Sequence, residues 1–345
     1  MLMRARYPFY ASDGFEGRLE RVRAHDPSPL GPVVLVHGAG VRSSIFEPPV
    51  DMTLVRYLAE AGYDVWLEDW RASIDLPPSQ WTLDQAAVYD HPAAVRKIMD
   101  VTGASTIKAV IHCQGSTSFM LSAAAGLLPQ VSVIVSNAVS LHPIIPSVSK
   151  FKIVCCTPLL AWLTPDLNPQ WAIQSKTYVQ KALVGLVRLT HHECDNDVCK
   201  FTSFTYGTGF PVLWRHENLN EATHEWICHE FASVPISFFK QMSQSVRAGT
   251  LMGVNHLSVL PKLIAAQPAK TQARMVFLTG DKNVCFLPES QMRTYQFFNE
   301  QRRNFHSFHL LAGYRHLDVF IGQRAALDVF PIILDELNRS TEQMN

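Results

Sequence analysis

The chain has no surplus of either charge, few cysteines and no long apolar run. Its 345 residues include 30 Lys and Arg against 30 Asp and Glu. Because no basic excess is available to neutralise phosphates, we expect no nucleic-acid partner. Seven cysteines in a chain of this length are too few for a disulfide scaffold and suit a reducing compartment.

A membrane-spanning helix needs ~18 consecutive apolar residues, and no stretch reaches that length. The longest run, IVCCTPLLAWL at 153–163, is too short and contains Pro158. The first residues, MLMRARYPFYASDG, lack the apolar region of a secretory signal. We therefore expect a soluble, cytoplasmic protein without an integral membrane segment.

Apolar residues make up 47 % of the chain, and their pattern predicts a mostly parallel sheet flanked by helices. Helical patterns separate the expected strands, which are 31–38, 64–70, 105–112, 131–140, 273–280 and 304–311. The alternation stops between about 141 and 270, where aromatic residues, Pro and His are frequent. We expect an α/β core over 1–140 and 271–345, with 141–270 inserted as a largely helical cap.

The segment VIHCQGS (110–116) joins an expected strand to an expected helix and places Cys113 at the turn. A nucleophile elbow has this layout, with the pattern G-x-S-x-G. Here Cys113 replaces Ser and Ile111 replaces the first Gly, while Gly115 matches the second. The helix N-terminus should favour a thiolate at Cys113. A buried structural cysteine is the alternative.

Two further segments complete an acyl-transfer site. VLVHGAG (34–40) follows a strand, and the backbone N–H groups of Ala39 and Gly40, with that of Gln114, are candidates for an oxyanion hole. LLAGYRHLDVFIG (310–322) places His316 in a loop after a strand, where it is a candidate general base. Taken alone, VLVHGAG could be only a glycine-rich turn. Taken alone, His316 could be only a solvated loop histidine.

Elbow, glycine turn and late histidine occur in the order found in α/β-hydrolases, and the chain resembles that superfamily over nearly its full length. More narrowly, it resembles the hydrolase found alone or fused to cholesterol-oxidase-like GMC flavoproteins. That resemblance is carried by SFTYGTGFPVLWRHENLNEATHEW (203–226), LTGDKNVCFLPES (278–290) and GYRHLDVFIG (313–322). The first half, TLVRYLAEAGYDVWLEDWR…HCQGS, is also similar to polyhydroxyalkanoate synthases, whose nucleophile is likewise Cys.

The resemblance implies the α/β-hydrolase fold and a triad of nucleophile, acid and histidine, carried onto Cys113, a residue near 281–283, and His316. It implies no metal and no organic cofactor. It also leaves room for a functional link to a GMC flavoprotein oxidoreductase and for a homodimer.

The acid position departs from the family pattern. Hydrolases usually read G-x-x-D after this strand, whereas this chain reads GDKN at 280–283. Register favours Asn283 as the third triad member, with Asp281 as the runner-up. A Cys–His pair can work with Asn, which would accept a hydrogen bond from His316 through its amide oxygen. The alternative is that Cys113 and Asn283 together mark lost activity. Asp318 is a second candidate partner of His316, although a surface position is the simpler interpretation.

Two other segments contain metal-binding residue types. HHECDNDVC (191–199) offers His191, His192, Cys194 and Cys199, but their spacing matches no common zinc site. A surface loop is the favoured interpretation, with a Cys194–Cys199 disulfide as an alternative. HEWICH (224–229) nearly matches H-E-x-x-H, but Cys228 stands where the second His belongs, so a helix is expected. We therefore predict no metal site.

Together these features predict an α/β-hydrolase that cleaves a hydrophobic ester, thioester or lactone through an acyl-enzyme at Cys113. The apolar stretch IIPSVSKFKIVCCTPLLAWL (144–163) should shape a hydrophobic acyl pocket in the cap. Two alternatives remain: a Cys-dependent acyltransferase of the polyester-synthase type, and a non-catalytic binding protein with the hydrolase fold.

Overall fold

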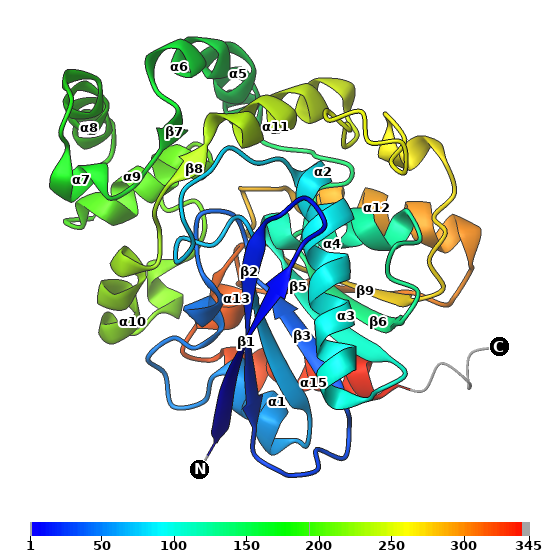
Figure 1. The fold of residues 1–345 in the computed structure, drawn as a ribbon. Helices are drawn as coiled ribbons and strands as arrows, with labels where there is room; N and C mark the ends of the chain where they lie inside the picture. The colour runs from blue at the N-terminus through cyan, green and yellow to red at the C-terminus, as the bar shows by residue number, and fades with distance from the viewer. Residues whose placement is uncertain (1, 193, 340–345) are drawn as a thin grey trace.

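An eight-stranded sheet forms the centre of the computed structural model, which describes residues 2–192 and 194–339 (Figure 1). The strand order is β1-β2-β4-β3-β5-β6-β9-β10. β2 pairs antiparallel with both β1 and β4, and the other strands pair in parallel. The strands are β1 (Met3–Tyr10), β2 (Glu16–Arg23), β3 (Pro32–Val36), β4 (Asp64–Asp69), β5 (Ile107–His112), β6 (Val131–Asn137), β9 (Arg274–Gly280) and β10 (Ser307–Leu311).

The six strands predicted from apolar runs are confirmed, and every residue of β3, β4 and β9 is buried. The N-terminal hairpin of β1 and β2 was not predicted. Its sequence gives little signal, because only one residue of β1 is buried. The hairpin forms one edge of the sheet and pairs with β4 through β2.

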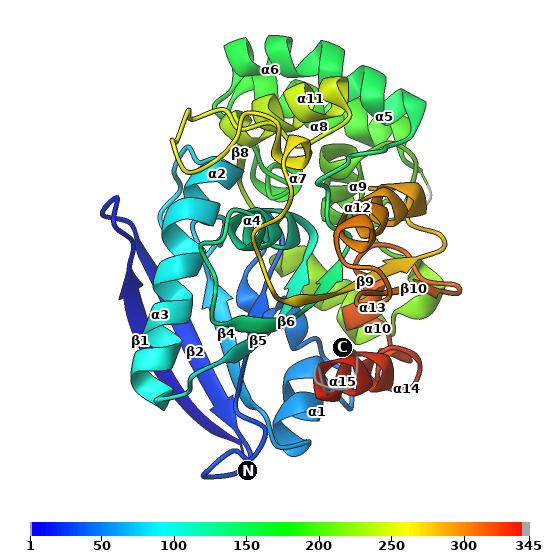
Figure 2. The same ribbon diagram turned by 90° about the vertical axis from the view of Figure 1, so that its right-hand side faces the viewer.

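Helices cover both faces of the sheet (Figure 2). On one face lie α3 and α4, and on the other α1 and α15. The core helices are α1 (Leu54–Glu60), α2 (Leu83–Gln85), α3 (His91–Thr102), α4 (Cys113–Ala124), α12 (Pro288–Gln301), α13 (Asp318–Ile321), α14 (Ala325–Asp328) and α15 (Phe330–Asn338). A 3₁₀ turn, Ser43–Phe46, follows the loop after β3.

The chain accommodates Pro92 without ending the helix. A π-helical turn, Ala86–Asp90, precedes it, and Pro92 occupies the first turn of α3. At that position the missing N–H has no intrahelical partner to lose.

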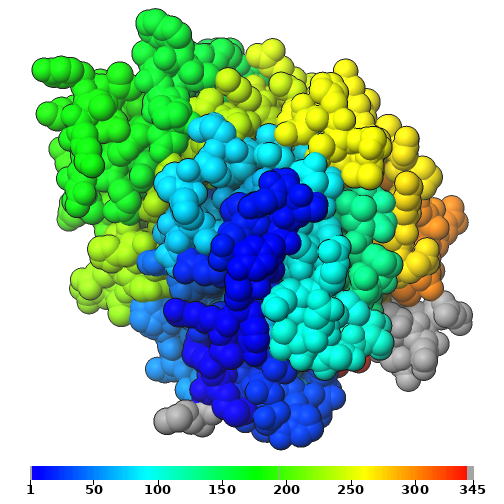
Figure 3. Space-filling model, viewed as in Figure 1, coloured from blue at the N-terminus to red at the C-terminus, as the bar shows by residue number. Residues whose placement is uncertain are grey.

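The segment between β6 and β9 is mainly helical and forms the upper part of the molecule in Figure 1. In Figure 3 its green portion projects as a lobe at the upper left. The strand pair β7 (Asp166–Leu167) and β8 (Val234–Pro235) ties its two halves together. Its helices are α5 (Ser147–Phe151), α6 (Thr157–Leu163), α7 (Trp171–Gln174), α8 (Tyr178–Thr190), α9 (Asp197–Tyr206), α10 (Glu221–Trp226) and α11 (Ile236–Ala248).

Short turns complete this segment, namely the π-helical turn Lys152–Cys156 and the 3₁₀ turns His216–Asn218, Ile227–His229 and Ile264–Ala266. Among the described residues, no helix combines the length and the apolarity needed to cross a bilayer.

Candidate active site

Cys113 lies at a sharp turn between β5 and α4, as the elbow pattern predicts. Its φ of 55° is in the left-handed region, which side chains rarely adopt outside strained turns. Gly115 allows the turn to pack on the neighbouring strand, because a Cβ there would lie 2.1 Å from the carbonyl oxygen of His37. Ile111, at the first glycine position of the usual pattern, is accommodated as a fully buried strand residue.

The backbone N–H groups of Ala39 and Gln114 face the sulfur of Cys113 closely enough to act against the rise in the pKa of its thiol. Two donors that converge on the nucleophile can also stabilise an oxyanion that forms beside it. The N–H of Gly40 donates instead to the carbonyl of Ala72 at 3.3 Å. The structure thus brings Ala39 and Gln114, but not Gly40, to the nucleophile.

The expected thiolate at Cys113 is not supported by its surroundings. Cys113 is buried, and this burial raises the pKa of its thiol to about 12, against the opposing effect of the two N–H donors. The helix N-terminus therefore does not keep Cys113 ionised at neutral pH.

His316 lies beside Cys113 and is only 1 % exposed. The sulfur of Cys113 and one ring nitrogen from each of His316 and His112 lie within 4.8 Å of one another. Burial lowers the pKa of His316 to about 3, so its ring is neutral at neutral pH. Its Nε2 has no hydrogen-bond partner among the described residues, so this nitrogen is available to a substrate or to the thiol.

Asn283, and not Asp281, contacts His316. The Nδ2 atom of Asn283 is 3.4 Å from Nδ1 of His316. The carboxylate of Asp281 instead accepts from the N–H of Gly313 at 2.7 Å and pairs with Lys282 at 3.1 Å. The structure therefore does not bring Asp281 to the histidine.

The orientation of the Asn283 amide is opposite to the expected one. Its oxygen accepts the backbone N–H groups of Cys285 at 3.0 Å and Phe286 at 3.3 Å, so its nitrogen must face His316. An amide N–H donated to Nδ1 favours the imidazole tautomer that carries its proton on Nε2. In that tautomer Nε2 cannot accept the proton of Cys113.

His112 belongs to the same group and was missed by sequence reasoning, although it directly precedes Cys113. Its ring centroid is 4.9 Å from that of His316, and its Nδ1 is 2.9 Å from the amide nitrogen of Asn137. The same amide nitrogen donates to the carbonyl oxygen of His316 at 2.9 Å. Asn137 therefore links the two histidines through His112 Nδ1 and the backbone of His316.

Asp318 is buried and does not serve His316. Its carboxylate accepts from the N–H groups of Arg215 and Arg315 and from the amide of Asn218, at 2.7 to 3.1 Å. Burial raises its pKa to about 6. Both the surface position and the role as partner of His316 are therefore wrong for Asp318, which holds neighbouring loops together.

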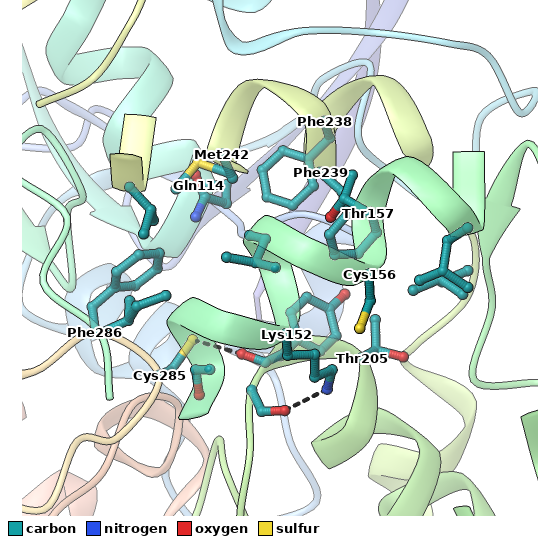
Figure 4. Close-up of a pocket in the computed structure, with 18 of the residues that line it drawn as sticks. Gln114, Lys152, Cys156, Thr157, Thr205, Phe238, Phe239, Met242, Cys285 and Phe286 are labelled. Atoms are coloured by element: carbon teal, nitrogen blue, oxygen red, sulfur yellow. Dashed lines mark hydrogen bonds between the residues drawn. The ribbon is translucent and has the colours of Figure 1, made fainter. Parts of the chain in front are cut away.

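An apolar cavity opens above Cys113, between the sheet and the mainly helical segment that joins β6 to β9 (Figure 4). It comprises about 820 Å³ of space, part of it continuous with solvent. Figure 4 shows Phe238, Phe239 and Met242 on one side, with Lys152 and Cys285 on the other. A smaller space of about 260 Å³ is lined by Cys113 and His316. Cys113 and Tyr206 line both spaces.

A second array of serine, histidine and acid lies in the core. Nδ1 of His91 is 2.8 Å from the carboxylate of Glu68, and Nε2 is 2.7 Å from the hydroxyl of Ser118. All three residues are fully buried, and none lines either cavity at Cys113. Because no substrate can reach it, this array ties α3, α4 and β4 together and is not a catalytic triad.

The structure also places the metal-binding residue types seen in the sequence. Cys194 and Cys199 are free thiols that meet His216 and His224 in the cap. His191 and His192 lie outside that group: the ring of His191 packs on Phe210, and His192 is exposed.

Comparison with known proteins agrees with the fold and points to lipases and esterases. No family model matches the chain. The chain is 30 % identical to Lipase lipl-1 of Caenorhabditis elegans over 128 residues, which cover 32 % of each chain. It is 26 % identical to Sterol esterase 2 of Saccharomyces cerevisiae over 167 residues, covering 45 % of this chain and 28 % of the esterase. The chain thus spans about a third of the length of these curated relatives.

Solved structures of similar shape cover almost the whole chain. An esterase from Exiguobacterium antarcticum superposes with a TM-score of 0.58 at 12 % identity, covering 96 % of this chain and 99 % of that one. A monoacylglycerol lipase from Paleococcus ferrophilus gives a TM-score of 0.54 at 15 % identity and covers 98 % of both chains. With the mostly parallel sheet, these matches confirm the α/β-hydrolase fold.

Proposed function

We propose that the chain hydrolyses carboxylic esters of apolar acyl groups through a thioester formed on Cys113. The observation that carries this proposal is the position of Cys113, which lies at the elbow, under two N–H donors and at the floor of an apolar cavity. The partial sequence matches to lipases and a sterol esterase support an ester substrate.

In the proposed reaction the sulfur of Cys113 attacks the ester carbonyl and its proton passes to Nε2 of His316. The carbonyl oxygen becomes an oxyanion held by the N–H groups of Ala39 and Gln114. The carbon–oxygen bond then breaks, and the alcohol leaves with the proton from His316. Water hydrolyses the thioester by the same route, with His316 as the base, and releases the acid.

This route requires the His316 tautomer that carries its proton on Nδ1. The amide nitrogen of Asn283 opposes that tautomer, and the thiol and the imidazole are both neutral at rest. We therefore expect slow chemistry. The same geometry favours a second candidate function, an apolar ligand-binding protein that keeps the hydrolase fold without turnover.

The finer predictions belong to the same proposal. Thioesters and lactones offer the same carbonyl to Cys113 and are expected substrates. Transfer of the acyl group to a hydroxyl, as in polyester synthases, remains the alternative outcome of the second step. The link to a GMC flavoprotein, the homodimer, the cytoplasmic location and the division into core and cap stay predictions.

The test is a series of p-nitrophenyl esters of rising acyl length, assayed with the native chain and with Cys113→Ala. We expect rates to rise with chain length, since each buried CH₂ offers up to ~0.8 kcal/mol. We also expect intact-mass spectra to show an acyl adduct on the native chain only. Equal rates in both proteins would refute the nucleophile. Binding of a long-chain ester without product would instead support the ligand-binding function.

A further inference from the structure

Two cysteines and two histidines converge in the cap, in a group that shares no residue with the Cys113 site. One ligating atom from each of Cys194, Cys199, His216 and His224 lies within 4.8 Å of the other three. Sγ of Cys194 is 3.6 Å from Nε2 of His224, and Sγ of Cys199 is 3.4 Å from Nε2 of His216. The two imidazole rings meet edge to face, with centroids 4.7 Å apart.

These separations match the edges of a tetrahedron of ligands around zinc. With Zn–S near 2.3 Å and Zn–N near 2.05 Å, tetrahedral geometry places sulfur and nitrogen about 3.6 Å apart. We propose that Cys194, Cys199, His216 and His224 bind one zinc ion. Two sulfur and two nitrogen ligands in this geometry select zinc, and four protein ligands leave no open position. The ion is therefore structural.

The turn that carries the cysteines is arranged to present them. The side chain of Asn196 accepts the N–H of Cys199 at 3.0 Å and so caps α9. The backbone N–H of Asn196 donates to the sulfur of Cys194 at 3.3 Å. Asn196 thus holds both cysteines of the turn through backbone hydrogen bonds.

The two histidines are also fixed by their local structure. The turn His216–Asn218 is anchored by Asp318, which accepts from the amide of Asn218 at 2.7 Å. His224 lies on α10, whose first turn is capped by Asn220 through the N–H of Thr223 at 2.7 Å. Preformed ligand positions reduce the ordering cost of metal binding.

The sequence shows why the site was missed. Cys194 and Cys199 have the C-x₄-C spacing of many zinc sites, but their partners are His216 and His224 and not the adjacent His191 and His192. The histidine pair follows after 16 intervening residues and is separated by seven, wider than the common H-x₃₋₅-H. Only the fold of the cap brings the two pairs together.

A zinc ion here would join three segments of the cap: the loop before α9, the turn at His216, and α10. The stretch just before His216 also supports the candidate active site. The carbonyl of Leu213 accepts the N–H groups of His316 at 3.1 Å and Leu317 at 2.7 Å. The metal would therefore stabilise the backbone on which the His316 loop rests.

The test measures zinc in the full chain, purified under reducing conditions and dialysed against metal-free buffer after zinc loading. We expect about one zinc per chain by elemental mass spectrometry. The double variants Cys194→Ser/Cys199→Ser and His216→Ala/His224→Ala should lose at least about tenfold in zinc affinity. Cys155→Ser and His192→Ala are the controls, because both residues are exposed and lie outside the group.

A second measurement needs no variant and so does not depend on the variants folding. Cobalt(II) added to the metal-free native chain should give the intense visible bands of a tetrahedral ion and a thiolate charge-transfer band. Zinc should then abolish both. A weak octahedral cobalt spectrum, or zinc content unchanged in the two double variants, would overturn the proposal. A Cys194–Cys199 disulfide in the reduced preparation would do the same. None of these readouts depends on ester hydrolysis.

Discussion

The amide nitrogen of Asn283 faces Nδ1 of His316 across 3.4 Å, because two backbone N–H groups hold the amide oxygen on the other side. In the familiar Ser–His–Asp arrangement a carboxylate occupies this position and fixes the tautomer that works as a base. Here the amide favours the opposite tautomer. The three side chains therefore occupy the positions of a catalytic triad, but the favoured tautomer of His316 carries its proton on Nε2, where it cannot act as a base.

Replacing Asn283 with Asp should activate the site. One carboxylate oxygen can keep the two backbone N–H groups, while the other accepts the Nδ1 proton of His316 and frees Nε2. Since the wrong tautomer costs about 10⁴ in kcat in a serine protease, we expect Asn283→Asp to raise kcat at least about tenfold. The measurement is steady-state hydrolysis of p-nitrophenyl butyrate.

Two further variants serve as comparisons for the effect of Asn283→Asp on kcat. Asp281→Asn should leave kcat nearly unchanged, since Asp281 binds Gly313 and Lys282. Asn283→Ala should not reproduce the gain in kcat, because it supplies no acceptor for the Nδ1 proton of His316, and it should destabilise the loop that carries Cys285. A drop in kcat for a well-folded Asn283→Asp protein would contradict the assigned amide orientation.

Alkylation of Cys113 should be slow at neutral pH and should accelerate steadily with pH. With a thiol pKa of about 12, roughly one molecule in 10⁴ or fewer carries the thiolate at pH 7.5. Iodoacetamide labelling, followed by peptide mass mapping, should rise about tenfold per pH unit between 7 and 10. The exposed Cys155 serves as a reference for reagent activity. A rate for Cys113 that levels off below pH 8 would show an activated thiolate instead.

The preference for acyl-chain length should change when Leu160 on α6 is replaced, and should not change when its neighbour Leu159 is replaced. Leu160 lines the large cavity, whereas Leu159 is 59 % exposed. Leu160→Trp should fill part of the cavity and lower kcat/KM for long acyl esters by roughly tenfold, with little effect on acetate. Leu159→Trp is the matched control and should leave the chain-length profile unchanged. Similar profiles for the two variants would place the acyl chain elsewhere.

Two glycine substitutions should change stability in opposite directions. A Cβ at Gly115 would lie 2.1 Å from the carbonyl oxygen of His37, so Gly115→Ala should lower the free energy of unfolding by about 2 kcal/mol or more. Gly185 lies in α8 with open space around it, so Gly185→Ala should raise it by about 0.5–1 kcal/mol. Urea unfolding followed by circular dichroism measures both. A neutral Gly115→Ala variant would mean that the elbow can move away from β3.

The sequence predicted the parts of this molecule that local patterns determine. Buried β-branched runs indicated the strands, and HCQG at 112–115 located the elbow. The edge strand β1 escaped detection because its mostly exposed residues leave no apolar alternation to recognise.

What the sequence could not provide depends on contacts between distant segments. The direction of the Asn283 amide is decided by the backbone of Cys285 and Phe286 after the loop has folded. The high pKa of Cys113 comes from burial under the cap, which no motif encodes. The pairing of Cys194 with His224 joins residues 30 positions apart.

Helix α9 carries Cys199 in its first turn and ends at Tyr206, whose hydroxyl donates to the carbonyl of Ala39 at 2.7 Å. Its ten residues form a strut about 15 Å long. One end is fastened at the cysteine–histidine group and the other at the loop that presents an N–H to Cys113. This edge of the cap therefore cannot swing away without breaking an attachment.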